Sequence, residues 1–272
     1  MNTRAIKAIV RKDLKVAMQN KGVVLPIIIL PLILFIVFPW IMVYASTMAD
    51  TMGTSMSNVD EILARMPAGL LSELSGYTQE QQLIVFSLVY MLAPMFLILP
   101  LMVSSVFAAD SFAGEKERKT LESLLYTPTT DRELFTAKLA GAWTTAMAVA
   151  LLSFVVYAIM VNVAAWPSIG QIFFPNWMWI ALVFWVTPAV AGLGLVVMVF
   201  VSARAQGFQD AYQTGGLVVL PVLALMIGQI SGVMYFSLGV VLFVGLVIWI
   251  LDAILLRYAS KSFRRGELMT KF

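Results

Sequence analysis

The sequence predicts an all-α polytopic membrane protein with six transmembrane helices. Of its 272 residues, 61% are hydrophobic and only 12% are charged, which is far from the averages of soluble domains. Four runs contain no Asp, Glu, Lys or Arg: 22–49, 81–109, 139–203 and 211–251. A helix needs about 20 apolar residues to cross a bilayer. The first two runs therefore hold one span each, and the last two hold two spans each.

These six spans divide the chain into a transmembrane domain, residues 23–257, between two charged ends, residues 1–22 and 258–272. We expect the spans at about 23–44, 83–109, 135–161, 179–201, 212–230 and 236–257, with an outside loop at 45–82. The spans contain several prolines, and those of the first span predict kinks, which membrane helices tolerate when neighbouring groups satisfy the freed backbone carbonyls. The prolines include Pro26, Pro31, Pro39, Pro94, Pro100 and Pro188.

The basic residues are sorted by this topology. Of 18 Lys and Arg residues, only Arg65 falls in a segment that six spans place outside. This distribution follows the positive-inside rule and predicts that both termini are cytoplasmic, in a multi-pass protein of the plasma (inner) membrane. We expect no cleavable signal peptide, because the first apolar run follows a charged segment and is too long for a signal-peptide core.

The N-terminal segment, residues 1–22, has the pattern of an amphipathic helix. Basic residues recur at steps of three and four opposite an apolar stripe. Such a helix would lie along the inner leaflet with its basic face on anionic lipid, although a general positive-inside anchor would look the same. The basic residues are Arg4, Lys7, Arg11 and Lys15, and the stripe is Ile6, Ile9, Val10, Leu14 and Ala17.

The composition also excludes several chemistries. Without cysteine or histidine, the chain has no disulfide, no thiol nucleophile and neither of the two commonest soft metal ligands. No Gly-x-x-x-x-Gly-Lys-Ser/Thr phosphate loop occurs, so the chain cannot bind ATP in that manner. An intramembrane aspartyl enzyme would need a second aspartate in the spans. We therefore predict no catalytic residue, no metal site and no nucleic-acid partner.

Residues 110–134 form an elbow between spans two and three. Glu115 with Lys119, and Arg118 with Glu122, are spaced as i,i+4 pairs and favour a helix over 111–126. Pro128 would end it.

A second helix is expected to begin directly after the elbow's proline, because Thr130 and Glu133 have the spacing of a capping box. We expect the charges of the elbow to face a cytoplasmic partner. The alternative is a plain amphipathic loop whose charges only solvate a connector.

The ordered residues of this elbow resemble the signature of type-2 ABC exporter permeases. The matching residues are Glu115, Thr120, Leu121, Glu122, Leu124, Leu125 and Pro128, followed by Lys138. Members share six transmembrane helices, an N-terminal interfacial helix and, between spans two and three, a cytoplasmic coupling helix. Lys119 stands where many members have Gly, a departure that bears on the local contact with the ATPase.

The resemblance implies the membrane subunit of an ATP-driven exporter of a lipophilic or amphipathic substrate. The chain itself would need no cofactor, since ATP and Mg would be bound by a separate P-loop ATPase subunit present in two copies. A second permease copy would complete the pathway within the membrane lipid. The residues that would couple to the ATPase are Glu115, Glu117, Arg118, Lys119, Thr120, Glu122 and Pro128; the substrate-binding residues are unknown.

The alternative function is a stand-alone secondary transporter or a sodium-type ion-efflux permease. Such proteins place ionisable residues in mid-membrane, whereas these spans are almost uncharged. Asp252 is expected near the cytoplasmic end, within reach of Arg257. Four polar residues near the predicted outer ends of spans are expected to serve loops and helix ends in contact with water. They are Asn162, Gln171, Asn176 and Gln229.

Overall fold

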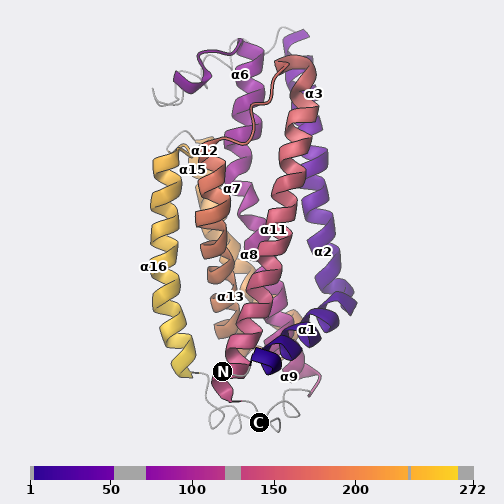
Figure 1. Ribbon diagram of the computed structural model, residues 1–272, viewed down its shortest axis with the longest axis vertical. Coiled ribbons are helices and arrows are strands. Elements are labelled where there is room, and N and C mark those ends of the chain that lie inside the picture. Colours follow the sequence, from indigo (N-terminus) through magenta and orange to yellow (C-terminus); the bar gives the residue numbers. More distant parts are fainter. Residues whose placement is uncertain (1–2, 52–71, 120–129, 232–233, 263–272) are drawn as a thin grey trace.

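The computed structural model describes residues 3–51, 72–119, 130–231 and 234–262, and within these ranges it is helical without any strand. Figure 1 shows a bundle of long helices with the short helix α1 lying across one end. Six helices are long and apolar enough to cross a membrane, which confirms the predicted number of spans. They are Lys21–Met48, Gln79–Glu117, Glu133–Ile169, Trp177–Arg204, Phe208–Gln229 and Leu238–Ala259.

Most spans are built from several helical pieces. Short π-helical turns, η1 to η4, interrupt spans one, two and four, and η5 is a 3-10 turn. In chain order the elements are α1 (Thr3–Gln19), α2 (Lys21–Leu32), η1 (Ile33–Val37), α3 (Phe38–Thr51), α6 (Gln79–Val85), η2 (Phe86–Met91), α7 (Leu92–Phe96), α8 (Ile98–Ala109), η3 (Asp110–Gly114), α9 (Glu115–Glu117), α11 (Asp131–Ile169), α12 (Trp177–Ala181), η4 (Leu182–Val186), α13 (Thr187–Arg204), α14 (Phe208–Gly215), η5 (Gly216–Val219), α15 (Leu220–Ile230) and α16 (Leu238–Ser262).

Spans two and four form the centre of the bundle. In their most apolar windows 72% and 61% of residues are buried, against 17% to 28% in the other four spans. They approach closely at Gly194 of α13, where an added Cβ would lie 2.7 Å from the carbonyl oxygen of Leu101 and from Ser104 Oγ. A larger residue there would separate α8 from α13. The outer four spans expose their apolar side chains, as helices facing lipid do.

The helices of spans two and three are longer than predicted. The expected ranges were 83–109 and 135–161, but the helices cover 39 and 37 residues. At about 1.5 Å per residue each exceeds the roughly 30 Å hydrocarbon core, so both project beyond it. The predicted start of the helix that contains the third span is confirmed. Thr130 and Glu133 form the expected capping box, with the Glu133 N–H donating to Thr130 Oγ1 at 3.3 Å.

The elbow differs from its prediction in one respect. Residues 111–117 are not the start of a separate helix over 111–126, because they continue the helix of span two without a break. The chain leaves this helix at Lys119, whose φ of 55° is left-handed. Residues 120–129, which include Thr120, Glu122 and Pro128, lie outside the described residues.

A carbonyl that a proline of span two leaves without its helical donor is bound by a neighbouring helix. Pro94 has no N–H to donate to the carbonyl of Tyr90, four residues earlier. The side chain of Gln229, from α15, donates to that carbonyl instead at 2.5 Å. Gln229 is therefore a buried link between spans two and five rather than a water-exposed helix-end group.

The other three polar residues considered near the outer ends do serve loops and helix ends. Asn162 holds the segment after α11, because its Oδ1 accepts from the Phe173 N–H at 3.1 Å and its Nδ2 donates to the Phe174 carbonyl at 2.7 Å. Asn176 caps α12. Gln171 is exposed.

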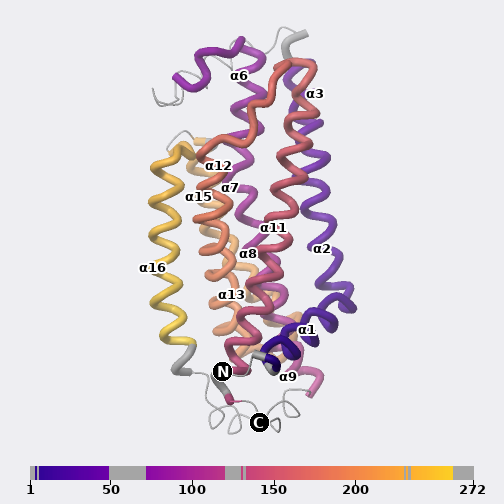
Figure 2. Tube along the Cα trace, viewed as in Figure 1, coloured from indigo at the N-terminus to yellow at the C-terminus, as the bar shows by residue number. Residues whose placement is uncertain are grey.

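The N-terminal helix α1 crosses the bundle beside α9, and we call this end of the molecule the charged end (Figure 2). The predicted amphipathic pattern is confirmed in part. The four predicted basic residues, Arg4, Lys7, Arg11 and Lys15, are exposed, while Ile9 packs against Leu134 and Ala137 of α11. Part of the apolar stripe therefore contacts protein, although Leu14 remains 40% exposed.

Candidate functional site

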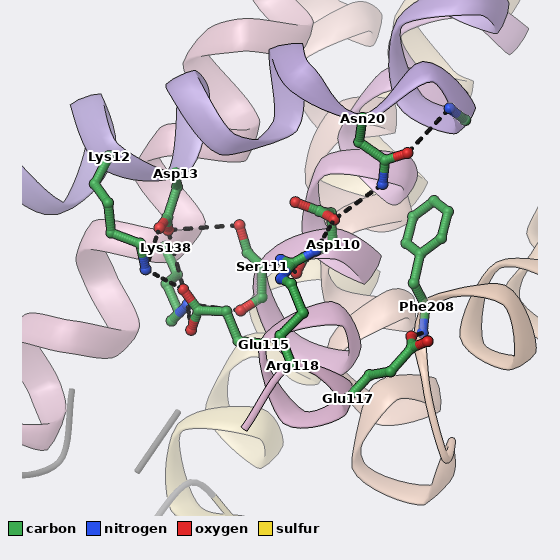
Figure 3. A network of polar contacts seen from close by, with 11 residues as sticks. Lys12, Asp13, Asn20, Asp110, Ser111, Glu115, Glu117, Arg118, Lys138 and Phe208 are labelled. Atoms are coloured by element: carbon green, nitrogen blue, oxygen red, sulfur yellow. Dashed lines mark hydrogen bonds and ion pairs between the residues drawn. The ribbon is translucent and has the colours of Figure 1, made fainter. Parts of the chain in front are cut away.

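The charged end holds a partly buried set of ionic side chains that we call the charged cluster (Figure 3). Its members come from three segments that are far apart in the sequence: α1, the end of span two and the start of α11. They are Lys12, Asp13, Asp110, Glu115, Arg118 and Lys138.

Lys138 is the centre of the charged cluster. Its side chain has no exposed surface, and its Nζ donates to Glu115 Oε2 at 2.5 Å and to the carbonyl of Ser111 at 2.6 Å. Asp13 Oδ2 lies 3.7 Å away. The ammonium also lies 5.4 Å from the centre of the Phe112 ring, within the range of a cation–π contact. A buried ammonium without such partners would be strongly unfavourable, so these contacts fix α11 to span two.

Glu115 connects the same point to the N-terminal helix. Its carboxylate is 3% exposed, and the oxygen not used by Lys138 pairs with Lys12 of α1. Lys12 Nζ is also 3.2 Å from Asp13 Oδ1. Two lysines and two carboxylates balance formally, which lets four ionic groups share one largely buried position. The carboxylate of Glu115 thus lies between α1 and α11 and holds both.

The cluster alters the protonation of its α1 members. Burial alone would lower the pKa of Lys12, but the hydrogen bond and charge of Glu115, together with Asp13, outweigh it and raise that pKa above 10.5. Burial raises the pKa of Asp13 above its usual 3.8 by more than the attraction of Lys138 lowers it. Lys12 is therefore held firmly in its charged form, whereas Asp13 accepts a proton more readily than an exposed aspartate does.

A second part of the cluster fixes the junction of α1 and α2. Arg118 folds back along its own helix, and its Nη1 donates to Asp110 Oδ1 at 3.0 Å. Asn20 Nδ2 donates to the same oxygen at 3.3 Å, while Asn20 Oδ1 accepts from the Gly22 N–H as the N-cap of α2. Asp110 thereby links the start of span one to the end of span two.

The last turn of span two also reaches the connection between spans four and five. Lys116 Nζ donates to the carbonyl of Ala205 at 3.1 Å, and Glu117 Oε2 accepts from the Phe208 N–H at 2.9 Å. Gly207 allows the second contact, since an added Cβ there would lie 2.6 Å from Glu117 Oε2. Five of the six spans are therefore joined, directly or through α1, at residues 110–118.

The residues predicted to couple to an ATPase thus have internal partners where the structure describes them. Glu115 binds Lys12 and Lys138 rather than Lys119, its expected i,i+4 partner. Glu117 and Arg118 bind Phe208 and Asp110. Lys119 is exposed at the end of the helix. Contact of this segment with an ATPase remains a prediction.

Sequence reasoning missed the contribution of α1 and gave Lys138 no role. A signal was present: Asp13 is the sole acidic residue of segment 1–22 and lies four residues from both Ile9 and Ala17, on the apolar stripe. An acidic residue at such a position predicts a buried counter-charge. That counter-charge is Lys138, which lies 125 positions away in the sequence, so no local pattern identifies it.

A cavity of about 230 Å³ lies between α3, span two and α15. It is almost wholly apolar, and Gln229 contributes a buried Oε1 that has no hydrogen-bond partner among the described residues. Its lining is Phe38, Met42, Ser87, Met91, Leu92, Met95, Met226 and Gln229. Among the residues that the structure describes, no group of three or more acidic side chains is arranged to hold a metal ion.

Six apolar spans, five of them joined at one end through residues 110–118, define a polytopic helical membrane protein. The family model of the ABC-2 family transporter protein matches residues 7–261, and the chain belongs to this family. It is a membrane permease of an ABC transporter, a transport subunit that is not itself the ATPase, and the family implies a partner ATP-binding subunit. Comparisons with curated proteins and with solved structures give no match.

Proposed function

We propose that this chain is the permease of an exporter in which a separate P-loop ATPase acts on the elbow at residues 110–134. Two ATPase copies and a second permease copy would complete the transporter, with both termini on the cytoplasmic side. The observation that carries the proposal is the charged cluster. It joins residues 110–118, the first part of the elbow, to α1 and to the third span. Within the same stretch, Lys116 and Glu117 bind the turn after the fourth span.

The cluster gives a displacement at the elbow a route into the membrane. Glu115 and Lys138 would carry it to the third span, and Lys12 would carry it to α1. Glu117 would carry it to the turn between spans four and five. Because buried ion pairs tolerate little separation, these elements would move together as a rigid body between inward-open and outward-open states.

The internal contacts divide the predicted coupling residues into two groups. We assign contact with the ATPase to Lys119, Thr120, Glu122 and Pro128. Glu115, Glu117 and Arg118 then transmit movement, since their charges are already paired within the permease.

A lipophilic or amphipathic cargo suits the apolar cavity between α3, span two and α15. Four methionines provide an adaptable lining, and Gln229 Oε1 would accept one hydrogen bond from the cargo. ATP-driven movement of the second span relative to α3 would then change the shape of the cavity. The direction of transport is assigned as outward from the resemblance of the elbow.

The test is co-purification of the tagged full-length chain from its native membranes, followed by ATPase and transport assays. Glu122→Lys should abolish binding of the ATPase subunit, because it reverses a charge assigned to the contact. Glu115→Gln should retain the ATPase but lose transport. Glu80→Gln, at the opposite end of span two, is the matched control and should change neither.

The alternative function gives the opposite result. If the chain alone, reconstituted in vesicles, transports its substrate on an ion gradient and retains no ATPase, it is a stand-alone secondary transporter. Transport that persists in Glu115→Gln at the wild-type rate would also overturn the assignment of the charged cluster.

A further inference from the structure

A second buried acidic residue lies inside the membrane-spanning part of the chain. Asp252, on α16, is 2% exposed and faces α13. A Cβ built on Gly192 of α13 would lie 2.6 Å from Asp252 Oδ2, so the carboxyl occupies the space that a side chain at 192 would need. Neither carboxyl oxygen has a hydrogen-bond partner among the described residues. The expected pairing with Arg257 is therefore not how this aspartate is accommodated.

No charged group on the facing elements compensates Asp252. Helix α16 packs on α12, η4 and α13, and Arg204 is the one charged residue of these three elements. Arg204 lies twelve residues beyond Gly192, which is about 18 Å along the helix. On α16 itself, Arg257 is exposed and five residues away, which places it about 140° around the helix from Asp252.

An ionised carboxylate in this position would be buried in an apolar interface without a counter-charge or a donor. The cost of such a group is several kcal/mol, and it is avoided when the group is neutral. A proton is the one cation that needs no additional space between α16 and Gly192. We propose that Asp252 is a proton-binding site, held as the neutral acid while α16 rests on α13.

The proton then acts as a ligand that binds one conformation of the protein, the one in which α16 packs on α13. Release of the proton requires water or a cation at the carboxyl, and the contact with Gly192 must open to admit either. Ionisation of Asp252 and separation of α16 from α13 are therefore linked, and each favours the other. This inference depends on the surroundings of Asp252 alone and is independent of the proposed function.

The experiment labels the purified full-length protein in lipid nanodiscs at neutral pH with dicyclohexylcarbodiimide, an apolar reagent for protonated carboxyls. The acid O–H adds across one C=N bond, the proton goes to nitrogen, and the adduct rearranges to a stable N-acylurea without a leaving group. Mass spectrometry of peptides should find the adduct on Asp252. Exposed Asp210 should be labelled at least tenfold less, and Asp252→Asn should remove the label from its peptide.

Two further measurements keep the inference falsifiable. In Gly192→Ala the new methyl group displaces the carboxyl, so labelling should fall several-fold, while Gly239→Ala, at an open position on α16, should leave it unchanged. The infrared difference spectrum of wild type minus Asp252→Asn should contain the C=O stretch of a protonated carboxylic acid. A carboxylate band in its place, or folded wild-type protein without the adduct, overturns the proposal.

Discussion

Glu115 and Asp252 are both acidic and both 2% exposed, yet their surroundings are opposite. Glu115 receives one lysine on each oxygen, from α1 and from α11. Asp252 faces a glycine, and its carboxyl oxygens have no hydrogen-bond partner in the part of the chain that the structure describes. The comparison shows that burial does not by itself define the role of a carboxyl group. A paired carboxylate joins helices, whereas an unpaired one in an apolar interface is accommodated only by neutralisation.

The backbone differs between the two sites as well. A π-helical turn, η3, precedes Glu115, and the helix ends four residues later in a left-handed residue. Such turns add a residue to one helical turn and change the direction of the side chains that follow. Asp252 lies within α16, which is regular throughout. The charged end is therefore shaped for its contacts, while the α13–α16 interface depends on a single small residue.

Removal of the central cation of the charged cluster should have the largest effect. Lys138→Met leaves Glu115 and Asp13 buried without their fully buried partner, and we expect a loss of about 3–5 kcal/mol in the free energy of unfolding. Denaturant unfolding in detergent measures it. The double variant with Glu115→Gln removes both charges of the Lys138–Glu115 pair and should recover part of the loss. A full loss in the double variant would show that the pair is not the main contact.

A change at the end of the span-two helix should have a smaller and opposite effect. Lys119 adopts φ of 55°, which costs a residue with a Cβ about 1 kcal/mol relative to glycine. Lys119→Gly should raise the unfolding free energy by that amount. Lys119→Ala, which removes the charge but keeps the Cβ, should give no gain. An equal gain in both variants would assign the effect to the charge.

The smallest predicted effect is on the pH dependence of the free energy of unfolding, and it arises from Asp13. Because burial raises its folded pKa above 3.8, the folded protein binds this proton before the unfolded chain does. Its stabilising contribution is therefore complete below the unfolded pKa and is lost as the pH rises through the folded pKa. Relative to Asp13→Asn, wild type should gain stability as the pH falls from neutral. A relative loss on acidification would mean that Lys12 and Lys138 dominate at this site.

Part of the fold and little of the site could be predicted. The six spans and the capping box at Thr130 follow from local sequence, whereas the hydrogen bond of Gln229 to the Tyr90 carbonyl, across 139 positions, does not. The length of span two did not follow from it either, because residues 110–117 are polar and were expected to belong to a separate helix of the elbow. They remain helical since their charges are paired in the charged cluster, and that pairing depends on α1 and α11.

The sequence by itself determined the number of spans and the positions of the charged residues. The free energy of transferring a helix into a membrane is a sum over contiguous residues, so the composition along the chain is sufficient to identify the spans. Only the tertiary structure decided which charges are paired. Glu115 meets Lys12 across 103 positions and Lys138 across 23, and Asp252 meets Gly192 rather than Arg257. These outcomes depend on which helices are neighbours and on which face each presents, and neither is encoded in any one segment.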